Sequence, residues 1–245
     1  MRHLILFIVA ILLASNVQAQ TTYLLAVGIN DYNDPNVHDL RCCENDVQSI
    51  SAVMKKQKAT VVQCLGKTAT KKNIQGALKV FCEDAKADDA IIFFFSGHGY
   101  PGGFCPVDMT GRNTNALTYE EIQTVFKNSK SRRKIVIADA CFSGGLRKNK
   151  STAPNQNKNG EVMFFLSSRT NEVSQEVPNG KNGQFTKFLV RALGGGADYN
   201  RDRVITAKEL FKFVSEGVSV ATGNKQHPVM WGKFNDNMAI TDWRQ

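Results

Sequence analysis

Five short apolar segments alternate with helical patterns along most of the chain. Each segment is rich in β-branched or aromatic side chains and is apolar on both faces, which predicts a strand that is covered on both sides. These segments span residues 23–29, 60–65, 90–95, 135–138 and 162–166. Strands of this kind are typical of parallel sheets rather than of sheets with one solvated face.

Helical periodicity fills the intervals between the predicted strands. Apolar residues recur with helical spacing over 45–56, 71–85, 120–128 and 185–193, and the capping box Thr118-x-x-Glu121 marks the start of the third helix. Buried strands that are joined by helices form a parallel sheet with helices on both faces. The sequence therefore predicts the α/β class: a three-layer α-β-α sandwich with a mostly parallel sheet, in one domain over 20–245.

The first twenty residues follow a different pattern. Arg2 and His3 form a basic start, residues 4–14 are apolar, and a small-residue cleavage signal ends at Ala19. The apolar stretch is shorter than the ~20 residues that span a bilayer. We therefore expect residues 1–19 to be a signal peptide, and an exported protein, periplasmic or extracellular, with no stable membrane span.

Composition narrows the class of protein. The chain is 42% hydrophobic and 22% charged, which excludes disordered, collagenous and multi-span membrane classes. The net charge of +9 comes from scattered basic residues, so we expect no nucleic-acid partner. Cys42 and Cys43 are adjacent and no C-x-x-C occurs among the six cysteines, which argues against a full disulfide framework and against zinc.

Two of the predicted strands are followed by side chains suited to covalent catalysis. Ser96-Gly97-His98-Gly99 follows the third strand, and Asp139-Ala140-Cys141-Phe142-Ser143-Gly144 follows the fourth. The carboxyl ends of parallel strands meet at one edge of the sheet, where functional crevices lie. An imidazole base raises the thiolate fraction of a nearby thiol, and the thiolate is the attacking species. A lone cysteine or histidine is usually structural, but together the motifs predict a nucleophile, Cys141, and its base, His98.

These two motifs resemble the catalytic motifs of the caspase-like cysteine peptidases, in particular the metacaspase and paracaspase branch, which includes bacterial members. Residues 23–30 resemble the first strand of that family. Residues 40–46 resemble its L-x-G-C-x-N-D segment, with Cys42 in place of the glycine, and Gly183-Gln184-Phe185-Thr186 resembles its G-x-F-T helix entry. The resemblance covers nearly all of the chain after residue 19 and implies a caspase-like sheet.

The resemblance also implies the roles of individual residues. Cys141 would be the nucleophile and His98 the general base and later the acid, and the backbone N–H groups of Cys141 and Gly99 would form the oxyanion hole. The implied reaction is peptide-bond hydrolysis through a thioester acyl-enzyme. No third member of a catalytic triad is implied.

Two carboxylates point to the substrate. We expect Asp46 and Asp139 near the reactive groups, and neighbouring buried carboxylates repel each other and favour a cationic ligand. The resemblance agrees, because metacaspases and paracaspases cut after Arg or Lys with residues that match Cys43, Asp46, Ser96 and Asp139. The expected partners are therefore peptides or proteins with Arg or Lys before the cleaved bond. In the alternative interpretation, Asp46 caps the helix that begins nearby.

Calcium is a weaker expectation than capping. Many metacaspases carry an acidic calcium loop after the histidine motif, but residues 100–107 contain no carboxylate. A second pattern, Asp198-x-Asn200-x-Asp202 with Glu209 twelfth, has calcium-loop spacing, yet Arg203 stands where that loop needs glycine. Thr206-x-x-Glu209 equally forms a capping box for a helix over 207–214. We favour the cap and expect no cofactor and no metal.

Residues 144–160 have the composition of an exposed linker, rich in Asn, Lys, Ser and Gly with little to bury. A linker tethered near the nucleophile is present at high effective concentration, so a pocket that prefers basic residues would cut it. The candidates for self-processing are Arg147, Lys148, Lys150 and Lys158.

Two other functions stay open on the sequence. One is a peptidase of the same clan with another specificity, such as a legumain-like or gingipain-like enzyme. The other is a non-catalytic caspase-like binding module. Among the remaining residues, we expect His38 and His227 on the surface, a solvated charged run over 130–134, and a cleft-lining role for 167–169.

Overall fold

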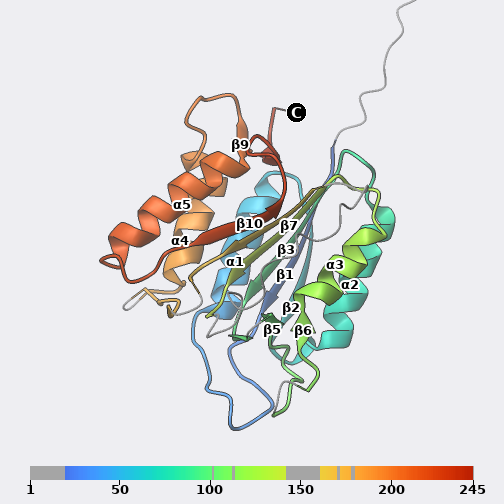
Figure 1. Cartoon of the computed structure of the whole chain (residues 1–245), viewed down its shortest axis with the longest axis vertical. Coiled ribbons are helices and arrows are strands. Elements are labelled where there is room, and N and C mark those ends of the chain that lie inside the picture. The colour runs from blue at the N-terminus through green and yellow to red at the C-terminus, as the bar shows by residue number, and fades with distance from the viewer. Residues whose placement is uncertain are drawn as a thin grey trace, which may run out of the picture.

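The computed structural model describes residues 20–244 except 101, 112–113, 142–160, 170–171 and 178–179. A six-stranded sheet in the order β10-β8-β7-β3-β1-β2 forms its centre (Figure 1). Neighbours from β8 to β2 are parallel, and only β10 joins antiparallel. The strands are β1 (Thr22–Gly28), β2 (Thr60–Leu65), β3 (Ala90–Ser96), β7 (Arg133–Asp139), β8 (Glu161–Leu166) and β10 (Val229–Lys233).

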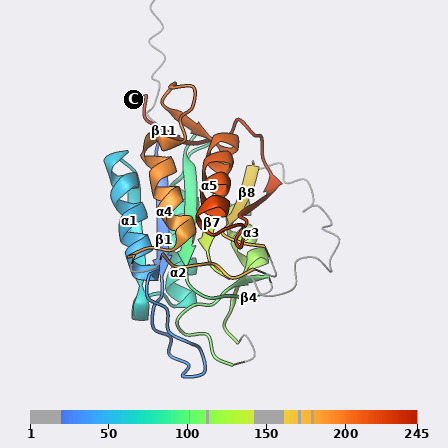
Figure 2. The same cartoon turned by 90° about the vertical axis from the view of Figure 1, so that its left-hand side faces the viewer.

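Helices cover both faces of this sheet. The layer that faces the viewer in Figure 2 holds α1 (Cys43–Lys56), α4 (Gln184–Arg191) and α5 (Ala207–Ala221). The opposite layer holds α2 (Lys71–Asp84) and α3 (Tyr119–Lys127) (Figure 1). The predicted three-layer sandwich with a mostly parallel sheet is confirmed. The five predicted strands and the first three helices lie within two residues of the observed bounds.

Smaller elements decorate the ends of the sandwich. One three-stranded sheet joins β4 (Gly99–Tyr100), β5 (Gly103–Phe104) and β6 (Leu117–Thr118), and β9 (Val204–Thr206) pairs with β11 (Ala239–Asp242). A 3₁₀ turn, η1 (Gly66–Thr68), follows β2, and a π-helical segment, η2 (Ala192–Gly196), follows α4. The helix expected over 207–214 continues to residue 221.

The wholly apolar strands supply two hydrophobic cores. Successive side chains of a strand point to opposite faces. Phe93 and Phe95 therefore pack under α2 and α3, whereas Ile92 and Phe94 pack under α1, α4 and α5. All four side chains are almost fully buried. A run without polar interruption is what a strand between two helical layers requires.

Three expectations about burial or strands need correction. Both faces of residues 60–65 were expected to be covered, but Thr60 and Val62 are exposed, because β2 is an edge strand with one neighbour. The other edge strand, β10, was not anticipated from its short and partly polar sequence. The run over 130–134 is not uniformly solvated: Lys130 and Arg132 are exposed, but Lys134 lies inside β7 and is 2% exposed.

All six cysteines are free thiols, and Cys141 is the least buried of them. None of the helices in the described part of the chain is long and apolar enough to cross a membrane. The expected signal peptide (1–19) and linker (144–160), with its basic residues, lie outside the described residues.

Candidate active site

The register of two neighbouring strands brings His98 and Cys141 to the same edge of the sheet. Ser96 at the end of β3 lies opposite Asp139 at the end of β7. His98 and Cys141 each follow that pair by two residues, and both are half-buried. The N–H of Gly97 donates to the carbonyl of Asp139 at 3.3 Å, which holds the two strand ends together. The predicted imidazole and thiol therefore leave the sheet side by side.

The backbone of His38 orients the imidazole. Nε2 of His98 lies 2.6 Å from the carbonyl oxygen of His38, and a carbonyl can only accept a hydrogen bond. Nε2 therefore carries the proton, which leaves the lone pair of neutral His98 on Nδ1. The His38 side chain is exposed, as expected. Its carbonyl contact was not anticipated, because a backbone group has no signature in the sequence.

Tyr32 holds the same histidine through a hydrogen bond and a ring contact. Its hydroxyl accepts the N–H of His98 at 2.7 Å, and the two rings lie 5.0 Å apart. A Cβ on Gly97 would come within 2.7 Å of the Tyr32 hydroxyl oxygen. The glycine before the histidine is therefore needed for this close approach.

Two serines hold the segment that carries Cys141. Ser174 donates its N–H to Sγ of Cys141 at 3.1 Å, and its carbonyl oxygen lies 4.0 Å from the sulfur. The Ser167 hydroxyl bonds both the N–H and the carbonyl of Ala140, at 3.1 and 3.0 Å. Ser167 is fully buried and holds the peptide group before the thiol, and the cleft-lining role expected for 167–169 stays a prediction.

Burial dominates the acidity of this thiol. Desolvation raises the pKa of Cys141, the N–H of Ser174 lowers it, and the charge of Asp139 raises it again. A buried thiol with a raised pKa is protonated at neutral pH, and the thiolate is the nucleophilic form. A protonated Cys141 would therefore need a base close by in order to act as a nucleophile.

Asp46 and Asp139 are buried beside this pair of residues, with exposed fractions of 2% and 7%. Asp46 accepts the Ser96 hydroxyl at 2.8 Å, the side-chain amide of Asn182 at 2.9 Å and the Gly183 N–H at 3.1 Å. These bonds come from two separate segments of the chain, the end of β3 and residues 182–183. They fix the carboxylate without placing a positive charge against it.

Asp139 is held in the same manner. Thr186 donates both its N–H and its hydroxyl to Oδ2 of Asp139, at 3.1 and 2.8 Å. The hydroxyl of Ser174 donates to the other oxygen. A Cβ on Gly183 would lie 2.3 Å from Oδ2, so only glycine allows the chain to pass this carboxylate.

The two carboxylates weaken each other as acids. Burial raises the pKa of Asp46 to about 8, the charge of Asp139 adds to the rise, and hydrogen bonds from Asn182, Ser96 and Gly183 oppose it. Burial likewise raises the pKa of Asp139. The pair consequently holds fewer than two negative charges at neutral pH. A cation placed between them would favour full ionisation.

The four residues expected to bind substrate lie together. Cys43 begins α1, and its thiol lies beside the Ser96 hydroxyl and close to both carboxylates. Burial raises the pKa of this thiol strongly.

The alternative role of Asp46 as a helix cap is wrong. The N-cap of α1 is Cys42, and the Asp46 carboxylate bonds Ser96 and Gly183 instead of the free N–H groups of the helix.

The segment 172–177 was missed by the sequence analysis, although it touches both Cys141 and Asp139 through Ser174. Its first residue, Glu172, bonds Nδ1 and the N–H of His227, at 2.8 and 2.7 Å. His227 is thus half-buried and paired, which corrects its expected surface position. Gly183 and Thr186 were flagged by the G-x-F-T pattern, but Ser174 and Asn182 carry no comparable signal.

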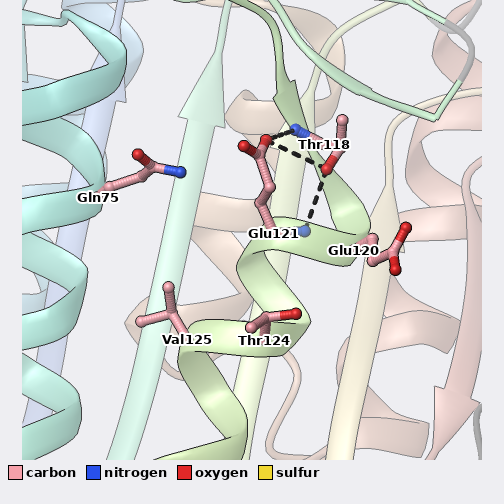
Figure 3. A pocket seen from close by; sticks show the side chains of 6 residues that line it. All are labelled: Gln75, Thr118, Glu120, Glu121, Thr124 and Val125. Carbon is pink, nitrogen blue, oxygen red and sulfur yellow. Dashed lines mark hydrogen bonds between the residues drawn. The ribbon is translucent and has the colours of Figure 1, made fainter.

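A hollow elsewhere on the surface lies between α2 and α3 (Figure 3). The Glu121 carboxylate at this hollow accepts the N–H and the hydroxyl of Thr118, and it pairs with Lys71 at 2.7 Å. The negative charge of Glu121 is therefore already engaged by the helix cap and by the ion pair with Lys71. The lining residues are Gln75, Thr118, Glu120, Glu121, Thr124 and Val125.

The loop with calcium-like spacing has its oxygens engaged. Asp198 accepts the N–H groups of Asp202 and Arg203, and Asp202 accepts that of Val204. Glu209 bonds the N–H and the hydroxyl of its cap residue at the start of α5. Across the described residues, His, Cys, Asp and Glu side chains form no group of three or more that could hold a metal ion.

A thiol and an imidazole at the ends of adjacent parallel strands, in an α-β-α sandwich with an antiparallel edge strand, define a caspase-like protein. The profile of the caspase domain peptidase family matches residues 21–238, and the chain belongs to this family. Metacaspase-1 of the yeast Scheffersomyces stipitis is 33% identical over 85 residues, a match that covers 31% of this chain and only 21% of that protein. The predicted family, including its metacaspase type, is confirmed.

A solved structure shares the fold. The crystal structure of protein GSU0716 from Geobacter sulfurreducens superposes with a TM-score of 0.65 at 17% sequence identity, and the match covers 88% of this chain and 95% of that one. At this identity the likeness concerns the fold alone.

Proposed function

We propose that the protein is an exported cysteine endopeptidase that hydrolyses peptide bonds after Arg or Lys, with Cys141 and His98 as its catalytic dyad. Family membership supports a cysteine peptidase that acts on peptides or proteins. One observation supports the finer proposal: Ser96 lies opposite Asp139, so His98 and Cys141 each follow the paired strand ends by two residues, and Asp139 is a buried carboxylate two residues before Cys141.

The proposed reaction uses groups that the chain supplies. Nδ1 of His98 takes the proton of Cys141, and the thiolate attacks the substrate carbonyl. The N–H groups of Cys141 and Gly99 stabilise the oxyanion. His98 then protonates the leaving amine, which departs and leaves a thioester. Water, deprotonated by His98, hydrolyses the thioester and restores the thiol.

The preference for a cation follows from the electrostatics of the pocket. Asp46 and Asp139 are buried with neutral hydrogen-bond donors, so their mutual repulsion and desolvation are uncompensated. An Arg or Lys side chain at this place forms charge-assisted hydrogen bonds and stabilises both ionised carboxylates. Ser96 and Cys43 complete the binding set, since both lie against the same carboxylates.

Peptides that differ only in Arg, Asn or Asp before the cleaved bond test the proposal. We expect the wild type to cleave the Arg peptide, Cys141→Ala to lose activity, and His98→Ala to lose roughly 10²–10⁴-fold. Cys64→Ala, at a buried free thiol in the edge strand β2, is the matched control and should remain active. Undiminished turnover by Cys141→Ala or His98→Ala contradicts the dyad.

The same experiment separates the two alternatives. Preferred cleavage after Asn indicates a legumain-like specificity and refutes the cationic pocket. If the wild type cleaves none of the peptides and a thiol-reactive Arg-peptide inhibitor does not label Cys141, the protein is a non-catalytic caspase-like module.

Export is supported by the basic, apolar and small-residue pattern of residues 1–19. Protein isolated from its natural host should begin at Gln20 when its N-terminus is sequenced. A mature protein that retains Met1 contradicts cleavage of a signal peptide.

A further inference from the structure

Gln226 is a fully buried polar residue in the short connection between α5 and β10. Its Nε2 donates to the Ser167 carbonyl at 2.9 Å and to the Ser174 hydroxyl at 3.2 Å, and its Oε1 accepts the Gln175 N–H at 2.9 Å. Both ends of the amide are thus satisfied inside the protein. A buried side chain with this many bonds has a single favourable orientation.

Two of the residues that Gln226 holds, Ser174 and Ser167, are in direct contact with the candidate site. Ser174 donates its N–H to Sγ of Cys141 and its hydroxyl to Asp139. The Ser167 hydroxyl holds the peptide group immediately before Cys141. Within the described part of the chain, the side-chain amide of Gln226 bonds Ser167, Ser174 and Gln175 and neither His98 nor Cys141. Ser167 and Ser174, which it bonds, both contact the site, and both lie more than fifty positions before Gln226 in the sequence.

We propose that Gln226 is a positioning residue of the peptidase: it keeps Ser174 over Cys141 and Asp139 and ties that contact to the strand end at Ser167. This inference rests on the proposed function, because it concerns the reactivity of the same thiol. Gln226 acts through the groups it holds and touches no reacting atom.

Backbone bonds hold the two ends of the segment 172–177: the N–H of Glu172 donates to Arg169, the carbonyl of Gln175 accepts from Gln184, and the N–H of Val177 donates to Asn182. Its middle, at Ser174, depends on side-chain anchors. At one end Glu176 pairs with Arg41, whose side chain is 83% exposed, and such surface pairs contribute little stability. Glu172 bonds His227 at the other end. Gln226 holds the middle and is the buried anchor, where hydrogen bonds are strongest and unmatched groups are most unfavourable.

Loss of the Gln226 amide should release Ser174 from the sulfur. The N–H of Ser174 lowers the pKa of Cys141, so its withdrawal raises that pKa and shifts thiolate formation to higher pH. The Ser174 hydroxyl also favours the ionised form of Asp139. One change therefore weakens both the nucleophile and the cationic pocket.

The test compares Gln226→Met, which keeps the length of the side chain but forms no hydrogen bonds, with Ser131→Ala. Ser131 is the matched control: its fully buried hydroxyl donates to the carbonyls of Asp89 and Arg133, at the opposite end of β3 and β7 from the site. Iodoacetamide alkylation of Cys141 is followed against pH by mass spectrometry of its peptide, beside kcat and KM for an Arg peptide and urea unfolding.

For Gln226→Met we expect the midpoint of alkylation to move up by about 0.5–1 pH unit, the effect of one hydrogen bond on a thiol, and kcat to fall by roughly ten-fold. Ser131→Ala should be destabilised but keep the wild-type alkylation profile. A purely structural role of Gln226 would lower stability in the same way and leave the profile unmoved.

A folded Gln226→Met protein with the wild-type alkylation profile and kcat overturns the inference. If that variant does not fold, Gln226→Asn decides, because its amide is one methylene too short to reach both serines. A wild-type profile and kcat in Gln226→Asn would likewise overturn it. Absence of peptide cleavage by the wild type refutes the proposed function instead, and the alkylation profiles still test whether Gln226 positions the thiol.

Discussion

Two buried carboxylates dominate the chemistry of this molecule at the scale of single residues. The donors found for Asp46 and Asp139 in the described residues are neutral hydroxyl, amide and backbone N–H groups. Such donors lower the pKa of each acid but do not offset its burial. The site is consequently most stable with one proton retained or with a cation bound.

The pH dependence of specificity follows from this raised pKa. Asp46 is protonated below about pH 8, so raising the pH ionises it and strengthens attraction for a cationic side chain. The ratio of kcat/KM for an Arg peptide over its Gln counterpart should therefore rise through about pH 8. Taking the ratio cancels every effect of pH that the two substrates share. Asp46→Asn should flatten the curve, and a flat wild-type ratio contradicts the interpretation.

The same raised pKa affects stability. In the unfolded chain Asp46 loses its proton near the ordinary pKa of about 3.9, but in the folded protein it keeps it to about pH 8. The folded state thus binds more protons in this window, and the contribution of Asp46 to the free energy of unfolding falls as pH rises from about 4 to 8. Urea unfolding of wild type and Asp46→Asn across this range provides a second readout.

Asp139→Asn should affect charged substrates most. Truncating one partner of a buried charge pair costs about 2–5 kcal/mol. The activation free energy that corresponds to kcat/KM should therefore rise by about 2–5 kcal/mol for Arg peptides and by less for neutral peptides. Asp89→Asn is the control, because Asp89 is also buried and accepts backbone N–H groups, at the opposite end of β3. Equal losses for both substrates would show that Asp139 supports the nucleophile rather than the pocket.

At the scale of elements, capping decides how the loop 198–209 is used. Thr206 and Glu209 form a complete capping box at the start of α5, as Thr118 and Glu121 do for α3. Arg203, where a calcium loop needs glycine, has a positive φ of 65°. The turn is therefore closed by its own side chains and backbone N–H groups.

Removing the cap tests this assignment. Thr206→Val should lower the free energy of unfolding by about 1 kcal/mol, and Thr118→Val, the matched change on α3, should have a similar effect. Because the carboxylates of the loop are engaged, millimolar calcium or EDTA should change neither stability nor activity. A rise of the wild-type Tm with calcium that disappears in Glu209→Gln would instead establish a calcium site.

At the scale of the whole molecule, the order of strands connects the site with the linker. β7 ends at the site. Its parallel neighbour β8 begins opposite Arg133, the first residue of β7, and so at the opposite end of the strands from the site. β8 is bonded on both sides, by β7 and by β10. A break in the chain between Cys141 and residue 161 would leave all of these pairings intact.

Self-processing should therefore produce two fragments that remain associated. Purified wild type is expected to split between Arg147 and Lys158 and to elute from gel filtration as one species, whereas Cys141→Ala remains whole. Mass spectrometry of the new ends identifies the bond. Equal splitting of Cys141→Ala in a protease-free preparation would show that another protease cuts the linker.

The sequence alone determined the layers of the fold and the placement of His98 and Cys141 just after neighbouring strands. Short, β-branched or aromatic apolar runs such as 90–95 predict strands with both faces covered, and helical periodicity predicts the helices that cover them. His98 and Cys141 were predictable because each follows such a run directly, so that their placement depends on local position and on the general geometry of parallel sheets.

Only the tertiary structure decided what surrounds these residues. Ser174 and Gln226 lie 33 and 85 positions after Cys141, and the His38 carbonyl that orients His98 lies 60 positions before it. Neutral side chains and backbone groups have no distinctive pattern, and their role arises from strand register and loop course. Periodicity encodes which face is buried, whereas contacts between distant segments depend on how the whole chain packs.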